Sequence, residues 1–215
     1  MESPGATRDT GFKTSKKEVK QLAIAWLALT LAVTFLFTDP VRTSISPGAF
    51  TTFFVVSFVT AGAGFLLHEL AHKVVAQRYG HWAEFRADYE MLVIAVVSGI
   101  VGFLFAAPGA VRISSRSGRG ITARESGIIS VAGPVTNLAL FVVFFVLALV
   151  VAPLNVEILN NVARLGTFIN AFLAAFNMLP FGPLDGRKVK RWNLGVFALT
   201  FVVSVVLALY SFGVF

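Results

Sequence analysis

The sequence contains an H-E-x-x-H motif, His68-Glu69-Leu70-Ala71-His72, whose residue types can bind a metal ion and move a proton. Positions i and i+4 of a helix lie on one face, so the imidazoles of His68 and His72 can reach the same Zn²⁺. The carboxylate of Glu69 can then accept a proton from a water that the metal activates. The motif therefore predicts a hydrolytic zinc site.

A zinc site of this kind needs a third protein ligand, and the chain has no cysteine to provide one. Most acidic residues outside the motif lie in loops or tails, whereas Asp185 ends an apolar run that prolines and glycines break. Irregular backbone at membrane depth is tolerated only where it is buried in protein or lines a cavity. Asp185 is therefore a good candidate for the third ligand, and a capping role at the membrane interface is the alternative.

The composition places these residues in a membrane protein. Apolar residues make up 56% of the chain and charged residues 13%, and the mean hydropathy is +0.79. Soluble domains carry about a quarter charged residues, so a soluble globular domain is excluded. The net charge of +7 then reflects orientation in a lipid bilayer, and no nucleic-acid partner is expected.

Five apolar runs are long enough to cross a hydrocarbon core of roughly 30 Å as helices. They are Gln21–Thr38, Thr43–Leu67, Ser126–Val156, Leu165–Leu184 and Trp192–Phe215. The expected fold is an all-α polytopic membrane protein with five spanning helices. We expect a single transmembrane domain over 21–215, with its catalytic core over about 50–190.

Residues 1–20 are polar and rich in lysine, and we expect them to form a disordered cytoplasmic tail. A cleaved signal peptide also begins with a basic region and is the alternative. The apolar run that follows is long for a signal sequence, and Asp39-Pro40 is a poor cleavage site. These features favour an uncleaved first span.

The zinc site constrains a further apolar run, Met91–Val111. His68 and Asp185 both lie near the exit ends of their helices, so these two helices must run in the same direction. A full crossing by Met91–Val111 would place the two ligands on opposite sides of the membrane. We therefore expect a re-entrant or interfacial hairpin, which also leaves the basic loops 108–125 and 186–191 on the cytoplasmic side.

Three motifs in this order resemble the site-2 protease family of intramembrane zinc metalloproteases. They are H-E-x-x-H at 68–72, Gly-Pro-x-x-Asn at 133–137, and Asn-x-x-Pro-x-x-Pro-Leu-Asp-Gly at 177–186. The resemblance covers about residues 50–190. The chain departs from the pattern at Arg187, where many relatives have a second glycine, and it shows no segment like their PDZ or CBS domains.

The resemblance implies one zinc ion per chain, bound by His68, His72 and Asp185. It also implies that Glu69 is the catalytic acid/base and that Asn177 contacts the substrate. Family members cleave transmembrane segments of other proteins, so the expected partner is a transmembrane protein substrate. The expected location is the plasma membrane of a prokaryote, with a cytoplasmic N-terminus.

Several polar and irregular features support either structure or function. Asn170 and Asn177 are seven residues apart and share a helix face, and we assign packing to Asn170 and a catalytic role to Asn177. Asn137 could serve either purpose. Residues 105–113 could form a short β-strand at the membrane edge that pairs with extended substrate, or a membrane-dipping loop.

Two other functions compete with this assignment. Prenyl-protein and heat-shock membrane proteases share H-E-x-x-H but take a glutamate from a later helix, where this chain has Asp185 instead. A non-proteolytic metal-binding protein or transporter would show several metal ligands along a path. The oligomeric state does not follow from the sequence.

Overall fold

The computed structural model describes residues 13–41, 44, 46–105, 107–115 and 118–214. It is mostly helical, but it also contains a two-stranded antiparallel sheet, which corrects the all-α expectation. The helices are α1 (Lys16–Thr38), α2 (Pro47–Ser57), α3 (Ala63–Arg78), α4 (Tyr89–Ile100), α5 (Ala123–Val151), α6 (Glu157–Asn177), α7 (Asp185–Trp192) and α8 (Leu194–Val214). The strands are β1 (Trp82–Ala87) and β2 (Gly109–Ser114).

Four helical segments among the described residues are long and apolar enough to cross a membrane. They are Lys16–Thr38, Pro47–Arg78, Ala123–Leu154 and Leu194–Gly213. The one expected span that is missing from these four, Leu165–Leu184, corresponds mainly to α6. This helix starts at Glu157 and carries Arg164 in its second turn, so it is less apolar than the other four.

Helix α1 begins earlier than the sequence analysis expected. The side chain of Ser15 accepts a hydrogen bond from the backbone N–H of Glu18 at 3.1 Å, which caps the first turn. The expected tail over 1–20 is therefore too long at its end, because Lys16–Lys20 are helical. Residues 1–12 lie outside the described part of the chain.

Helices α2 and α3 form one continuous segment through a π-helical turn at Phe58–Gly62. The carbonyl oxygen of Phe58 accepts a hydrogen bond from the indole N–H of Trp26 at 3.0 Å. A Cβ atom on Gly62 would lie 2.0 Å from the Trp26 ring. Glycine at this position therefore allows α1 to pack closely against the π turn.

The sheet shows that the segment between its strands returns to its starting point. Trp82 pairs with Ser114 and Ala87 with Gly109, so both ends of the intervening chain lie together. Helix α4 within it has 12 residues and extends about 18 Å, too short to cross the hydrocarbon core. The segment therefore turns back on itself, as the hairpin expected over 91–111 requires, and its re-entrant or interfacial position in the membrane stays a prediction. Strand β2 overlaps the strand expected near 105–113.

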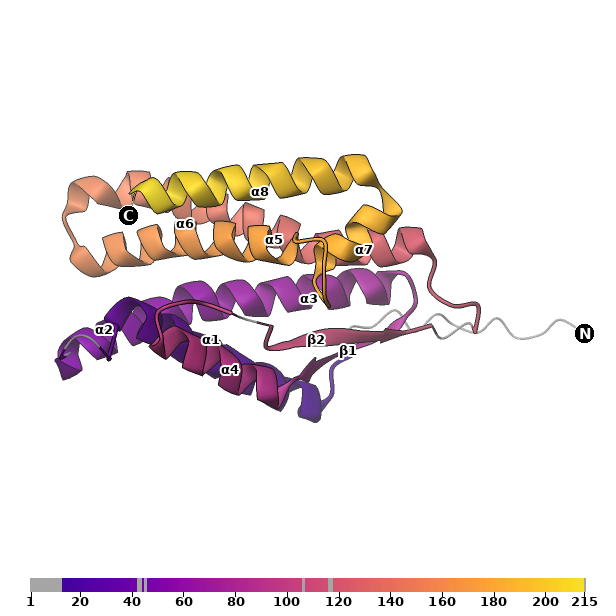
Figure 1. Cartoon of the computed structure of the whole chain (residues 1–215), viewed down its shortest axis with the longest axis horizontal. Helices are drawn as coiled ribbons and strands as arrows, with labels where there is room; N and C mark the ends of the chain where they lie inside the picture. Colours follow the sequence, from indigo (N-terminus) through magenta and orange to yellow (C-terminus); the bar gives the residue numbers. More distant parts are fainter. Residues whose placement is uncertain (1–12, 42–43, 45, 106, 116–117, 215) are drawn as a thin grey trace, which may run out of the picture.

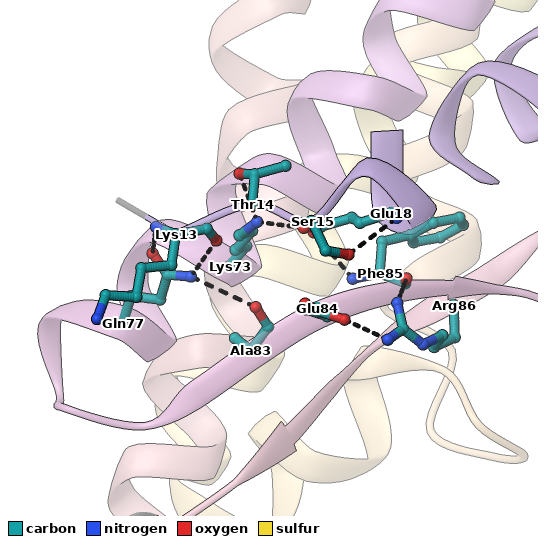
Figure 2. A network of polar contacts seen from close by, with 10 residues as sticks. All are labelled: Lys13, Thr14, Ser15, Glu18, Lys73, Gln77, Ala83, Glu84, Phe85 and Arg86. Carbon is teal, nitrogen blue, oxygen red and sulfur yellow. Dashed lines mark hydrogen bonds and ion pairs between the residues drawn. The ribbon is translucent and has the colours of Figure 1, made fainter. Parts of the chain in front are cut away.

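Strand β1 is tied to α1 and α3 by a buried ion pair (Figure 2). Lys73 donates hydrogen bonds to Glu18 at 2.5 Å and to Thr14 at 2.8 Å. The second carboxylate oxygen of Glu18 accepts from the backbone N–H of Phe85 in β1 at 3.0 Å. Both charged side chains are fully buried, so this contact fixes the sheet against the residue that follows His72.

The long helices lie side by side along the long axis of the molecule (Figure 1). The start of α1, the end of α3, the sheet, the start of α5 and α7 gather at one end. Helix α5 starts there with a capping box between Thr122 and Glu125. Helices α3 and α6 run in the same direction toward this end, as the zinc site requires.

Candidate metal centre

The three predicted ligands meet in the structure, although they come from α3 and from the start of α7. The Nε2 atoms of His68 and His72 lie 3.0 Å apart. Asp185 Oδ2 lies 3.3 Å from the Nε2 of His68 and 3.0 Å from the Nε2 of His72. All three side chains are buried, and their ligand atoms lie within 4.8 Å of one another.

The hydrogen bonds of the two imidazoles indicate that these atoms are arranged for a cation. His72 Nδ1 lies 2.7 Å from the carbonyl oxygen of Ile129, and His68 Nδ1 lies 2.6 Å from Asn137 Oδ1. These oxygens can only accept, so each Nδ1 carries the proton and each neutral ring presents the lone pair of its Nε2. Two lone pairs and a carboxylate oxygen then converge on one point, a donor set that suits Zn²⁺.

The third ligand, Asp185, is buried beside both histidines and has a cation near it. Lys188, one turn further along α7, lies 4.0 Å from the other carboxylate oxygen. An ionised carboxylate is the form that binds a metal.

Glu69 points into the same site. Its side chain is buried, and its Oε2 atom has no hydrogen-bond partner within the described residues. A buried carboxylate oxygen without a partner is costly, and such atoms mark sites where a water or substrate binds. Glu69 lines a cavity of about 80 Å³ with both histidines, Asp185 and Asn177.

Gly133, which belongs to the second of the three motifs, leaves room for the imidazoles of His68 and His72. A Cβ atom at this position would lie 2.5 Å from the Nε2 atoms of both His68 and His72. The structure shows that α5 approaches the two candidate ligands themselves.

Asn137 and Asn170 extend the contacts of His68 away from the metal centre. Asn137 Nδ2 donates to Asn170 Oδ1 at 2.9 Å, and Asn170 Nδ2 donates to the carbonyl oxygen of Gly166 at 2.9 Å. Both asparagine side chains are fully buried. Asn137 therefore orients a candidate ligand, and Asn170 holds Asn137 in place as well as packing α5 against α6.

The third asparagine, Asn177, is half-buried at the end of α6 and lines the cavity. Its Nδ2 atom donates to the carbonyl oxygen of Leu173 at 2.9 Å. No contact in the structure tests its predicted catalytic role, which stays a prediction. Its place in the wall opposite β2 is suitable for contact with a substrate.

Other residues at the site were not predicted. The carbonyl oxygen of Ile129 belongs to the backbone, so the sequence could not identify it as a partner of His72. Lys188 also lines the cavity, and its position three residues after Asp185 was the available indication. Residues of β2 form the facing wall, namely Gly109, Ala110, Val111 and Ile113.

The chain is similar to several known proteins. It is 41% identical to MJ0611 of Methanocaldococcus jannaschii, a candidate zinc metalloprotease, over 87% of this chain and 91% of the relative. It is 31% identical to Rip3 of Mycobacterium tuberculosis, also a candidate zinc metalloprotease, over 75% of this chain and 38% of the relative. It is 25% identical to the zinc metalloprotease MJ0392 of M. jannaschii, over 80% of this chain and 44% of the relative.

No family model and no solved structure matches the chain. The relatives imply zinc as the cofactor, in agreement with the buried group of His68, His72 and Asp185. The apolar helices make this a membrane protein. The chain belongs to the same zinc metalloprotease family as MJ0611, in agreement with its resemblance to the site-2 proteases.

Proposed function

We propose that the chain is an intramembrane protease that hydrolyses peptide bonds in transmembrane segments of other proteins. The observation that carries this proposal is the convergence of two imidazole nitrogens, a carboxylate oxygen and the free Oε2 of Glu69 in one buried cavity. The cavity lies within a bundle of apolar helices, where a substrate helix can meet it from the bilayer.

His68, His72 and Asp185 would hold the zinc ion. When bound, zinc supplies Lewis acidity, which lowers the pKa of a water and polarises a carbonyl group. Glu69 accepts the proton of the attacking water at its free Oε2 atom and later gives it to the leaving amine. Asn137 keeps the imidazole of His68 in the orientation that this arrangement needs, and Asn177 contacts the substrate.

Strand β2 gives an unwound substrate a place to bind. Residues of β2 form one wall of the cavity, and β1 is the partner of β2 along one edge. A peptide bond inside a helix is protected by its own hydrogen bonds, so cleavage requires an extended segment. Addition of that segment to the other edge of β2 would satisfy its backbone groups close to Glu69.

We further propose that the chain crosses the membrane five times, and that α6 crosses it in addition to the four long apolar segments. Helix α6 has 21 residues and extends about 31 Å, enough for a hydrocarbon core. Arg164 lies near the end of α6 that is away from α7. Most basic residues of the described loops lie at the other end of the molecule, where α7 is. This distribution supports a cytoplasmic side for α7 and the N-terminus. The membrane we propose is the plasma membrane of a prokaryote.

The described residues hold one group of metal ligands. A transporter would place further ligands along a path, so this observation favours a catalytic site over transport.

Replacement of the predicted proton acceptor tests the activity. We expect Glu69→Gln to abolish cleavage of a single-span substrate in reconstituted vesicles, because the amide cannot take a proton from water. Zinc content, measured by atomic absorption, should stay at one ion per chain. Glu157→Gln is a matched control, because Glu157 is exposed at the start of α6 and does not line the metal-site cavity. Undiminished cleavage by the Glu69→Gln variant would overturn the proposed mechanism.

A further inference from the structure

A second cavity opens beside the metal-site cavity. It has a volume of about 820 Å³ and lies between the sheet and the loop that precedes α7. Arg86 and Ala110 pair across the sheet, on the face opposite to the buried Ala83 and Phe85, and both line this cavity. The cavity therefore borders the outer face of the sheet, and at the end of the sheet it also reaches Ala87 and Gly109.

The two cavities adjoin each other. Ala107, Gly109 and Ala110 from the β2 side, and Pro183 and Leu184 from the loop, line both of them. A chain that crosses between these two walls would pass from one cavity into the other. Ala110 is small, so its side chain takes up little space between the two cavities.

The walls of the second cavity are aromatic. Tyr89, Phe105, Phe176 and Phe181 line it, together with Met91, and we call it the aromatic cavity. The rings of Phe105 and Phe176 pack edge to face with centroids 5.9 Å apart. Aromatic rings with methionine offer a large apolar contact area and adapt to different side-chain shapes.

The charged residues of the aromatic cavity balance one another. Arg86 and Arg112 lie on the sheet, and Asp88 and Glu90 lie at the start of α4. Arg86 is paired with Glu84, and Asp88 caps α4 by accepting from the backbone N–H of Met91 at 3.1 Å. The cavity therefore has no net charge to attract an ionic ligand, and its chemistry suits an apolar one.

We propose that the aromatic cavity is a specificity subsite, which receives large apolar side chains of the substrate segment whose peptide bond lies at the metal centre. This inference rests on the proposed protease function. A strand rises about 3.3 Å per residue and points alternate side chains to opposite sides. A substrate strand along β2 would thus direct a side chain into the aromatic cavity within a few residues of the cleaved bond.

Occupancy can be measured directly, because the chain has no cysteine. Ala110→Cys introduces a single thiol at the junction of the cavities, and Glu69→Gln in the same chain prevents cleavage. Ala123→Cys is the matched control, because Ala123 is exposed at the start of α5 and lines neither cavity. The rate of maleimide labelling is measured in lipid nanodiscs.

The probes are two synthetic transmembrane peptides of leucine and alanine with a central Asn-Pro break. One carries Phe-Phe beside the break, and the other carries Ala-Ala. We expect the Phe-Phe peptide to slow labelling of the Ala110→Cys variant about tenfold more than the Ala-Ala peptide, and to leave labelling of the Ala123→Cys variant unchanged. Equal protection by both peptides, or none by either, contradicts the inference. Labelling that is blocked by lipid alone and unaffected by peptide assigns the cavity to lipid and also contradicts it.

A variant of the cavity wall provides a second measurement. Phe181 lies in the loop with 60% of its surface exposed, so Phe181→Ala should leave the fold intact. We expect it to weaken binding of the Phe-Phe peptide about tenfold, because truncated aromatic anchors lose most of their contact. Phe103→Ala is the control, since Phe103 is 57% exposed and does not line the aromatic cavity. Equal effects of the two substitutions would contradict the inference.

Cleavage assays separate this inference from the proposed function. With Glu69 restored, cleavage of both peptides at the same rate supports the protease function and overturns the subsite. Binding that depends on Phe-Phe without any cleavage supports the subsite and overturns the function.

Discussion

The two imidazoles at the metal centre depend on the residues that accept hydrogen bonds from their Nδ1 atoms. One acceptor is a backbone carbonyl, which no side-chain substitution removes, and the other is Asn137 on α5. Asn137 is fixed in turn by Asn170, because its amide group donates to Oδ1 of that residue. Substitution of Asn137 therefore changes the orientation of the His68 ring while all three candidate metal ligands are kept.

Removal of the Asn137 amide should weaken zinc binding. We expect Asn137→Ala to lower zinc affinity about 10- to 100-fold, the usual cost of losing a partner that orients a metal-binding histidine. Thr136→Ala is the control, because the Thr136 hydroxyl donates only to the carbonyl oxygen of Ala132 in its own helix. Competition with a fluorescent zinc chelator measures both affinities, and equal affinities of the two variants would contradict the role given to Asn137.

The residues of the site were largely predictable, whereas their environment was not. Spacing on a helix was enough to identify His68 and His72, and a polar residue at a break in an apolar run identified Asp185. The role of Asn137 stayed open because its partners come from α3 and α6, which only the folded chain brings together. For the same reason, the sequence could not show that Gly133 faces the imidazoles.

At the scale of elements, the sheet is the part that sequence patterns described least well. Strand β1 follows α3 closely and has Ala, Glu and Arg among its six residues, so its composition does not indicate a strand. Its pairing with β2 requires contact across the whole α4 segment. Charged residues of other helices hold it in place, and their pairing is also a property of the folded chain.

The buried ion pair of Glu18 and Lys73 should contribute strongly to stability. We expect Glu18→Gln to lower the free energy of unfolding by about 3 kcal/mol, because it leaves a buried ammonium group without its partner charge. Glu84→Gln is the control, because Glu84 and Arg86 form a partly exposed pair whose loss costs about 1 kcal/mol or less. Denaturant titration in detergent measures both values, and a smaller loss for Glu18→Gln than for Glu84→Gln would refute this assignment.

For the whole molecule, the sequence predicted the order of the long helices and their directions. It did so because the metal site couples α3 to α6, and because Lys and Arg are distributed unevenly between the two ends. The boundaries were less accurate: α1 starts at Lys16 through the Ser15 cap, and α6 ends at Asn177, before the irregular stretch that leads to Asp185. Local caps and turns determine such boundaries, whereas hydropathy determines only the length of the apolar run.

Labelling from one side of the membrane tests the proposed five crossings. We expect a membrane-impermeant maleimide added outside intact cells to label Asn155→Cys and to leave Gly118→Cys unlabelled, because the two positions lie at opposite ends of α5. Permeabilised cells should label both variants, which controls for expression and reactivity. Labelling of Gly118→Cys from outside would exclude the proposed orientation.

The π turn at Phe58–Gly62 has a consequence for how α3 could vary. A π turn accommodates one residue more than an α-helical turn, so it shifts the angular phase of everything that follows it. One residue corresponds to about 100° of rotation around the axis of an α-helix. Helix α3 points His68 and His72 at α5 with this shift in place, so loss of a single residue within the π turn would rotate both imidazoles away from Asp185. The metal centre thus depends on an extra residue almost two helical turns before its first ligand.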